Sequence, residues 1–160
     1  MLKIKLMKNL LLITILTLIS FNCKAQNTID SNELTVNGII VIGKNKSILA
    51  TNFGQPINIE KSFSEMDNED MYIYKYDGIV FYVLKDLIDD YEITNNKHSF
   101  TKNSIKIGDN IDSLKIVFPL SYEKKGIDFL SLDLTDYDKY ISVYFNVTTK
   151  IITKIRIGTY

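Results

Sequence analysis

The chain has 160 residues, and its 19 Lys and Arg balance its 19 Asp and Glu. Four of the lysines lie in the first 25 residues, so the remainder holds 15 basic and 19 acidic residues, a formal charge of −4. No nucleic-acid partner is expected, because phosphate binding needs a concentrated positive face. An apolar content of 46% argues against disorder and is sufficient for one compact domain.

The first 25 residues follow the order of a secretory signal peptide. Lys3, Lys5 and Lys8 precede an apolar run that begins at Leu10, and Ala25 lies at the expected cleavage point. The run is shorter than the roughly 20 apolar residues that a membrane helix needs. We therefore expect a signal peptide over 1–25, export to the periplasm or the cell exterior, and a flexible N-terminal segment over 26–33.

Cys23 is the single cysteine, and two fates stay open for it. Cleavage after Ala25 would remove it and release a soluble protein. Cleavage before it would expose a site for lipidation and anchor the chain at the outer membrane; membrane contact is expected only in that form. Phe21 and Asn22 favour the soluble form, since a lipoprotein peptidase accepts small residues at these positions. Neither form has a disulfide.

An internal repeat spans most of the remaining chain. The segment from Ile42 to Phe53 matches the segment from Ile107 to Phe118 at an offset of 65, with Ile, Gly, Asn, Leu and Phe recurring in order. Flanking matches keep the same order at offsets of 66 and 64. The pattern predicts a duplication, with repeat 1 over 34–98 and repeat 2 over 99–160, both within one compact domain.

Each repeat is expected to contain one short helix and several strands. Asn45 and Asn110 are predicted to cap the helices, which end at Gly54 and at Pro119. The strands are expected at Met71–Tyr76, Ile79–Leu84 and Leu87–Thr94 in repeat 1, and at Phe129–Leu134, Ile141–Val147 and Ile151–Ile157 in repeat 2. The fold class is α+β, with each helix packed on an antiparallel sheet of three to four strands. One continuous sheet and two separate sheets both remain open.

The stretch from Gly43 to Pro56 contains a glycine, a capping residue, a short amphipathic helix and Phe53-Gly54-Gln55-Pro56. Followed by antiparallel strands, this unit resembles the tandem modules of the β-lactamase inhibitor protein and of the envelope lipoproteins of the SmpA and OmlA type. The resemblance implies a protein-binding scaffold outside the cytosol and carries over no catalytic residue.

Alternation along the strands separates a core face from an outer face. The rows centred on Phe81 and Phe145, the second ending at Val147, are expected to point inward. Exposed tyrosines on a sheet are common anchors for protein partners. The candidate binding residues on the outer face are Tyr82, Leu84, Tyr144, Lys154 and Arg156. Tyr72, Tyr74 and Tyr76 share one face of another strand, where both a binding role and a core role stay open.

Motifs for catalysis, phosphate binding or metal binding are missing from the sequence. The single histidine, His98, lies at the junction between the repeats and is expected to be solvated, and the acidic clusters are expected to be turns. No cofactor and no metal are expected. The leading hypothesis is an exported, non-catalytic binding module that acts on a protein partner in the cell envelope. The alternatives are an inhibitor or immunity protein against a specific enzyme or toxin, and an envelope hydrolase with a site between the repeats. The partner's identity and the oligomeric state stay open.

Overall fold

The computed structural model describes residues 28–101, 104–135 and 139–159. The expected signal peptide and Cys23 lie outside the described residues. Residues 28–33, expected as part of a flexible segment, form a two-residue strand, β1 (Thr28–Ile29), and a 3-10 turn, η1 (Ser31–Glu33). Ile29 in this segment is buried in the core. The fold is α+β, as expected, with short helices and one large sheet.

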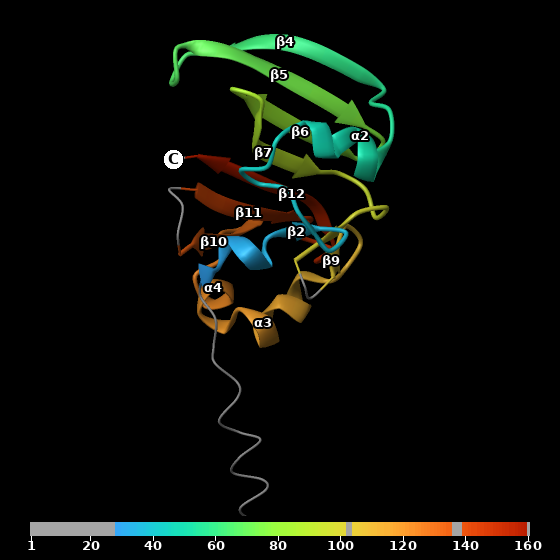
Figure 1. Cartoon of the computed structure of the whole chain (residues 1–160). Helices are drawn as coiled ribbons and strands as arrows, with labels where there is room; N and C mark the ends of the chain where they lie inside the picture. Colours follow the sequence, from blue (N-terminus) through green and yellow to red (C-terminus); the bar gives the residue numbers. More distant parts are fainter. Residues whose placement is uncertain (1–27, 102–103, 136–138, 160) are drawn as a thin grey trace, which may run out of the picture.

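The large sheet has eight strands in the order β1-β10-β11-β12-β7-β6-β5-β4 (Figure 1). Besides β1, they are β4 (Asn58–Ser64), β5 (Glu69–Tyr76), β6 (Ile79–Leu84), β7 (Leu87–Ile93), β10 (Phe129–Leu134), β11 (Lys139–Phe145) and β12 (Ile152–Thr159). Neighbouring strands are antiparallel except for β1 and β10. Pairing of β12 with β7 joins the two halves of the chain, so the sheet is continuous.

A smaller sheet and the helices complete the molecule. The four short strands, in the order β3-β2-β8-β9, are β2 (Thr35–Val36), β3 (Ile39–Ile40), β8 (Ser99–Phe100) and β9 (Ile105–Lys106). The remaining elements are α2 (Ser47–Phe53), η2 (Ile111–Ser113), α3 (Leu114–Val117) and α4 (Pro119–Glu123).

The predicted cap at Asn110 is confirmed at the start of η2, whereas the N-cap of α2 is Lys46, one residue after the predicted Asn45. The Asn45 side-chain oxygen accepts a hydrogen bond from the Ser47 amide at 2.9 Å, and that of Asn110 accepts one from the Asp112 amide at 2.8 Å. Pro119 follows the end of α3 and is also the first residue of α4, a position where its missing N–H costs nothing.

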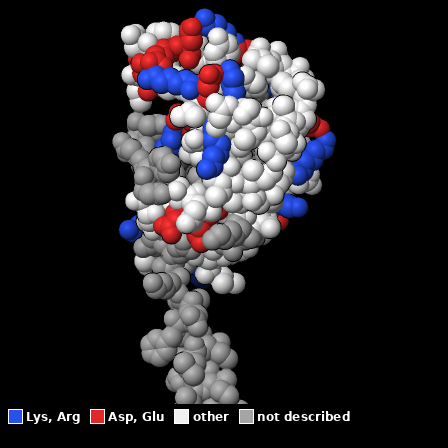
Figure 2. All heavy atoms as spheres, in the orientation of Figure 1, with Lys and Arg blue, Asp and Glu red and all other residues white. Residues whose placement is uncertain are grey.

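The hydrophobic core lies on one face of the large sheet, which we call the inner face. Phe81, Val143 and Ile155 point inward and are fully buried, and α2 packs on this face through Phe53, whose ring centroid is 4.9 Å from that of Phe81. Figure 1 shows α2 and the smaller sheet on the same side. Figure 2 shows this side of the molecule, where charged side chains gather at the end formed by β4 and β5 and uncharged atoms occupy most of the middle. The opposite face of the sheet is called the outer face.

One expectation about the strands was wrong, and one strand was missed. Val147 is 49% exposed instead of buried, because the register shifts between Tyr144 and Phe145 and the strand ends there in a turn. Strand β4 was not expected at all, because it alternates polar residues with only two large apolar ones, Ile59 and Phe63.

Among the described residues, no helix is long and apolar enough to cross a membrane.

Candidate functional site

The sheet brings the five candidate binding residues to one face. They lie on three strands, β6, β11 and β12, and cross-strand neighbours in an antiparallel sheet point to the same side. The pairs that connect them are Tyr82 with Asp90, Glu92 with Arg156, and Lys154 with Tyr144. Leu84 is two residues from Tyr82 on β6 and therefore shares its face. The expected grouping of these side chains on the outer face thus agrees with the strand register.

Side-chain contacts connect the outer-face residues of β10, β11, β12 and β7. The Lys154 ammonium nitrogen lies 4.6 Å from the centre of the Tyr144 ring and 3.7 Å from a carboxylate oxygen of Glu92. The ring centroids of Tyr144 and Phe129 are 6.4 Å apart. We call the set Phe129, Tyr144, Lys154, Arg156, Glu92, Tyr82 and Leu84 the outer strip.

Phe129 was missing from the sequence-based site although its signal was present. Leu130, Leu132 and Leu134 are buried, so alternation alone places Phe129 on the outer face, where it is partly exposed. Its ring also lies against Gly126: a β-carbon at that position would be 2.7 Å from the Phe129 ring. The glycine therefore leaves room for the ring beside β10.

Tyr82 lies at the other end of the outer strip and is half-buried. Burial, and then the negative charge of Glu92, raises the pKa of the Tyr82 phenol. The phenol is therefore neutral near pH 7 and able to donate a hydrogen bond. Arg156, two residues from Lys154 on β12, is exposed and adds a second cation to the strip.

A buried ion pair that sequence reasoning missed lies near Tyr82. The Lys139 ammonium donates to carboxylate oxygens of Asp89 and Asp90, each at 2.8 Å, and the lysine side chain is only 9% exposed. Burial raises the pKa of Asp90 despite the opposing effect of Lys139. Burial would lower the pKa of Lys139, but the hydrogen bonds to the two aspartates outweigh it and raise that pKa. This cluster links β11 to β7 across the pairing of β12 with β7, which we call the seam between the two halves.

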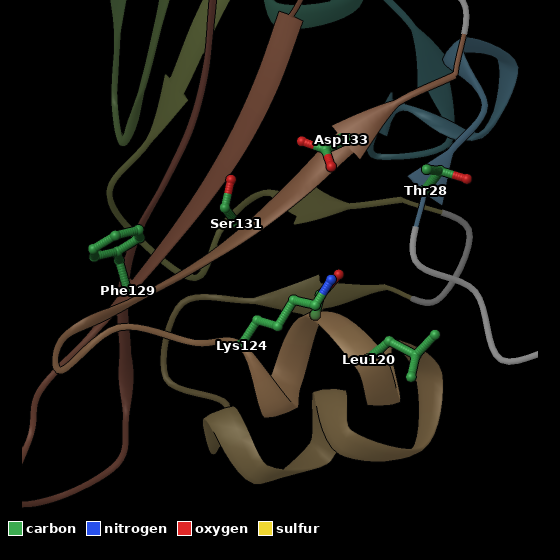
Figure 3. A pocket seen from close by; sticks show the side chains of 7 residues that line it. Thr28, Leu120, Lys124, Phe129, Ser131 and Asp133 are labelled. Carbon is green, nitrogen blue, oxygen red and sulfur yellow. The ribbon is translucent and has the colours of Figure 1, made fainter.

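A pocket of about 360 Å³ opens beside the outer strip, where α4 meets β10 and β1 (Figure 3). Its lining residues are Thr28, Leu120, Ser121, Lys124, Phe129, Ser131 and Asp133. Figure 3 shows Leu120 and Lys124 on the helix side and Ser131 and Asp133 on the strand side. The lining offers hydroxyls, one ammonium and one carboxylate, but no histidine that would activate a serine. The pocket belongs to the second half of the chain and β1, whereas the hydrolase alternative expected a site between the halves.

His98 is not the solvated residue that the sequence suggested. Its Nδ1 lies 3.1 Å from the Asn37 amide nitrogen, and its Nε2 lies 3.0 Å from the Asp77 carbonyl oxygen. These partners assign an Nδ1 that accepts and an Nε2–H that donates. The imidazole therefore connects the β2–β3 turn to the β5–β6 turn, which is a structural role.

The row of Tyr72, Tyr74 and Tyr76 lies on the inner face, across from Val83, Phe81 and Ile79. Tyr76 is buried and Tyr74 packs against the core, while Tyr72 is partly exposed beneath the Lys46 ammonium. This placement favours the core role. In the described parts of the chain, no cluster of three or more His, Cys, Asp or Glu is arranged to hold a metal ion.

Comparison with known proteins gives a likeness of fold. No protein-family model matches the chain, and no curated protein matches it in sequence. A cysteine-rich secretory protein from Staphylococcus aureus subsp. aureus Mu50 is similar in structure, with 16% identity and a TM-score of 0.54 over 86% of this chain and 48% of that chain. An extracellular protein containing a SCP domain from Bacillus anthracis str. Ames matches with 15% identity and a TM-score of 0.48 over 74% and 44% of the two chains. The chain thus spans about half the length of the solved chains it matches.

These comparisons overturn the expected resemblance to the β-lactamase inhibitor protein and to SmpA and OmlA lipoproteins. The structural likeness is instead to a secretory protein of a different fold. The stretch from Gly43 to Pro56 misled because a capped short helix ended by a glycine is a local device that occurs in many folds. The pairing of β7 with β12 makes the eight strands one continuous sheet, and no residue pattern in that stretch indicates it.

Proposed function

We propose that the protein is an exported, non-catalytic binding module whose outer strip contacts a protein partner in the cell envelope. The observation that carries the proposal is the contiguous array of Phe129, Tyr144 and Lys154 on the outer face of the large sheet. Aromatic rings held in place by a cation and by one another lose little side-chain entropy on binding, which suits them as interface anchors.

Export is supported by two independent features. The first 25 residues have the order of a signal peptide. The solved chain of similar fold from Staphylococcus aureus is described as a secretory protein.

The proposal includes a duplication as the origin of the fold. Equivalent backbone hydrogen bonds recur at the predicted offset: the Gly43 amide donates to Ile88 at 2.8 Å, and the Gly108 amide donates to Ile152 at 2.9 Å. Ile88 and Ile152 return a bond of 2.8 Å to the residue after each glycine. The duplicated halves would differ on the outer face, where acidic side chains on β7 meet basic ones on β12.

The partner should offer complementary chemistry to this mixed surface. Lys154 and Arg156 provide donors for carboxylates or carbonyl groups, and the rings of Tyr144 and Phe129 provide apolar contact area. Because the cations lie beside Glu92 and Asp90, the surface is not suited to polyanions. A folded protein surface with both apolar and acidic groups fits best.

The test places a photo-crosslinking amino acid at Leu84 in the protein, produced in its native host. We expect one specific crosslinked partner, and Tyr144→Ser should weaken its capture by about fivefold or more, since anchor residues contribute above 1 kcal/mol. Tyr72→Ser is the matched control, because Tyr72 is partly exposed on the inner face. Equal loss in both variants, or no crosslink from Leu84, would contradict the proposal.

A further inference from the structure

The free edge of the large sheet is the strand β4. It pairs with β5 through seven residue pairs from Asn58 to Ser64, and it stands last in the strand order. Among the described residues, no strand pairs with its other side. An edge of this length presents a row of backbone N–H and C=O groups to solvent. The opposite edge differs, since the short strand β1 covers part of β10 there.

The inner side of β4 carries two large apolar side chains that the core does not cover. Ile59 is 49% exposed and Phe63 is 52% exposed, because α2 packs over the neighbouring strands through Phe53 and does not bury β4. Figure 1 shows β4 as the outermost strand, beyond β5. The edge therefore combines unpaired backbone groups with apolar side chains, the two elements that strand addition uses.

Lys61 lies between these two apolar residues on the same side of β4. Its ammonium nitrogen is 2.7 Å from a carboxylate oxygen of Asp70 on β5, and both side chains are more than half exposed. An exposed ion pair of this kind is weak and readily exchanged. The lysine is thus the charged group that an added strand would meet at its centre.

A second copy of the chain is a poor occupant of this edge. An antiparallel two-fold pairing that sets Ile59 against Phe63 of the second copy also sets Lys61 directly against its own counterpart. Like charges in opposite positions destabilise a strand pair, and an inward-pointing lysine on an edge is a known barrier to self-pairing. A foreign strand with a carboxylate at that position meets attraction instead.

We propose that β4 accepts an extended segment of another protein by antiparallel strand addition. The segment carries an acidic side chain opposite Lys61 and apolar side chains opposite Ile59 and Phe63. Strand β5 separates this edge from the outer strip, and the apolar side chains of β4 point to the opposite face, so the two surfaces are tested independently.

The test uses the 15N-labelled protein and two acetylated, amidated peptides, Thr-Val-Thr-Glu-Thr-Val-Thr and the same peptide with Lys in place of Glu. We expect the Glu peptide to cause saturable shifts of the backbone amide signals from Asn58 to Ser64. The Lys peptide should bind about fivefold more weakly, as expected when an opposite-charge pair is replaced by a like-charge pair. Lys61→Glu should reverse this preference, whereas Lys115→Glu, the same charge change on α3, should retain it.

Three outcomes would overturn the proposal. The first is the absence of β4 shifts with either peptide, and the second is an equal affinity for the two peptides. The third is an unchanged preference in a folded Lys61→Glu variant, judged by the dispersion of its amide spectrum. Shifts of the β4 signals on simple dilution of the protein would assign the edge to a second copy and would also refute it.

Discussion

At the scale of single residues, Tyr91 is unusual because a polar hydroxyl is buried in the core together with its ring. Tyr91 is fully buried, and its hydroxyl has no hydrogen-bond partner among the described residues. Burial raises the pKa of this phenol well above its usual value, so the hydroxyl stays neutral. The ring packs against Phe81 at 6.1 Å and contributes to the core, while the hydroxyl has lost its contact with water.

Tyr91→Phe should therefore stabilise the protein. The substitution keeps the ring and removes the unsatisfied hydroxyl, so we expect the free energy of unfolding to rise by about 1 kcal/mol. Urea denaturation followed by circular dichroism measures the change. Tyr122→Phe is the control, because the Tyr122 hydroxyl donates to Asp112 and its removal should give no gain. A clear loss of stability in Tyr91→Phe would show that the hydroxyl has a partner.

At the scale of elements, the hairpin turns differ in how well their residues suit them. The β2–β3 turn uses Asn37 and Gly38, with φ of 54° and 80°, the combination that two-residue hairpins favour. The β6–β7 turn places Lys85 and Asp86 at φ of 49° and 65°. A lysine in this left-handed region is strained, because its β-carbon crowds the following carbonyl.

Lys85→Asn should relieve this strain. Asparagine tolerates the left-handed region, so we expect a gain of about 0.5–1 kcal/mol in the free energy of unfolding. The Lys85 ion pair with Glu69 is lost, but both side chains are exposed and the pair contributes little. Lys85→Val loses the same ion pair and adds a β-branched residue, and it should be destabilised in parallel thermal melts. If both variants change stability equally, the strain argument fails.

The sequence predicted correctly those strands whose structure is determined by their own residues and the adjacent turns. Strands β6 and β10 occupy the expected residues, because apolar alternation and the adjacent turns determine them locally. The outer placement of Tyr82 and Tyr144 follows from the same alternation. Strand β4 was missed because its pattern is polar except for Ile59 and Phe63, which is normal for an edge strand but a weak signal.

What the sequence could not reveal depends on contacts between distant segments. The contact of Lys139 with Asp89 and Asp90 joins residues about fifty positions apart, and nothing in either local pattern points to it. The two partners of His98 likewise come from separate turns. Such contacts follow from the register between β7, β12 and β11, which local alternation does not specify.

At the scale of the whole molecule, the stability of the two halves depends on one seam. Strand β12 pairs with β7 through only three residue pairs, Ile155 with Ile93, Arg156 with Glu92, and Ile157 with Tyr91. The isoleucines and Tyr91 are fully buried in a core cluster that includes residues of both halves. Because the apolar residues of the seam belong to this shared core, neither half keeps its own core when the seam opens.

Ile155→Ala should therefore weaken both halves together. Removal of this fully buried side chain is expected to cost about 2–5 kcal/mol, and the loss should appear equally in β5–β6 and in β10–β11. Hydrogen exchange measured by mass spectrometry reports each pair of strands separately. Val80→Ala, a smaller truncation at a half-buried outer position in the first half, is the control and should have a much smaller effect. Loss of protection confined to β10–β11 would mean that the halves unfold independently and that the continuous sheet does not make them one cooperative unit.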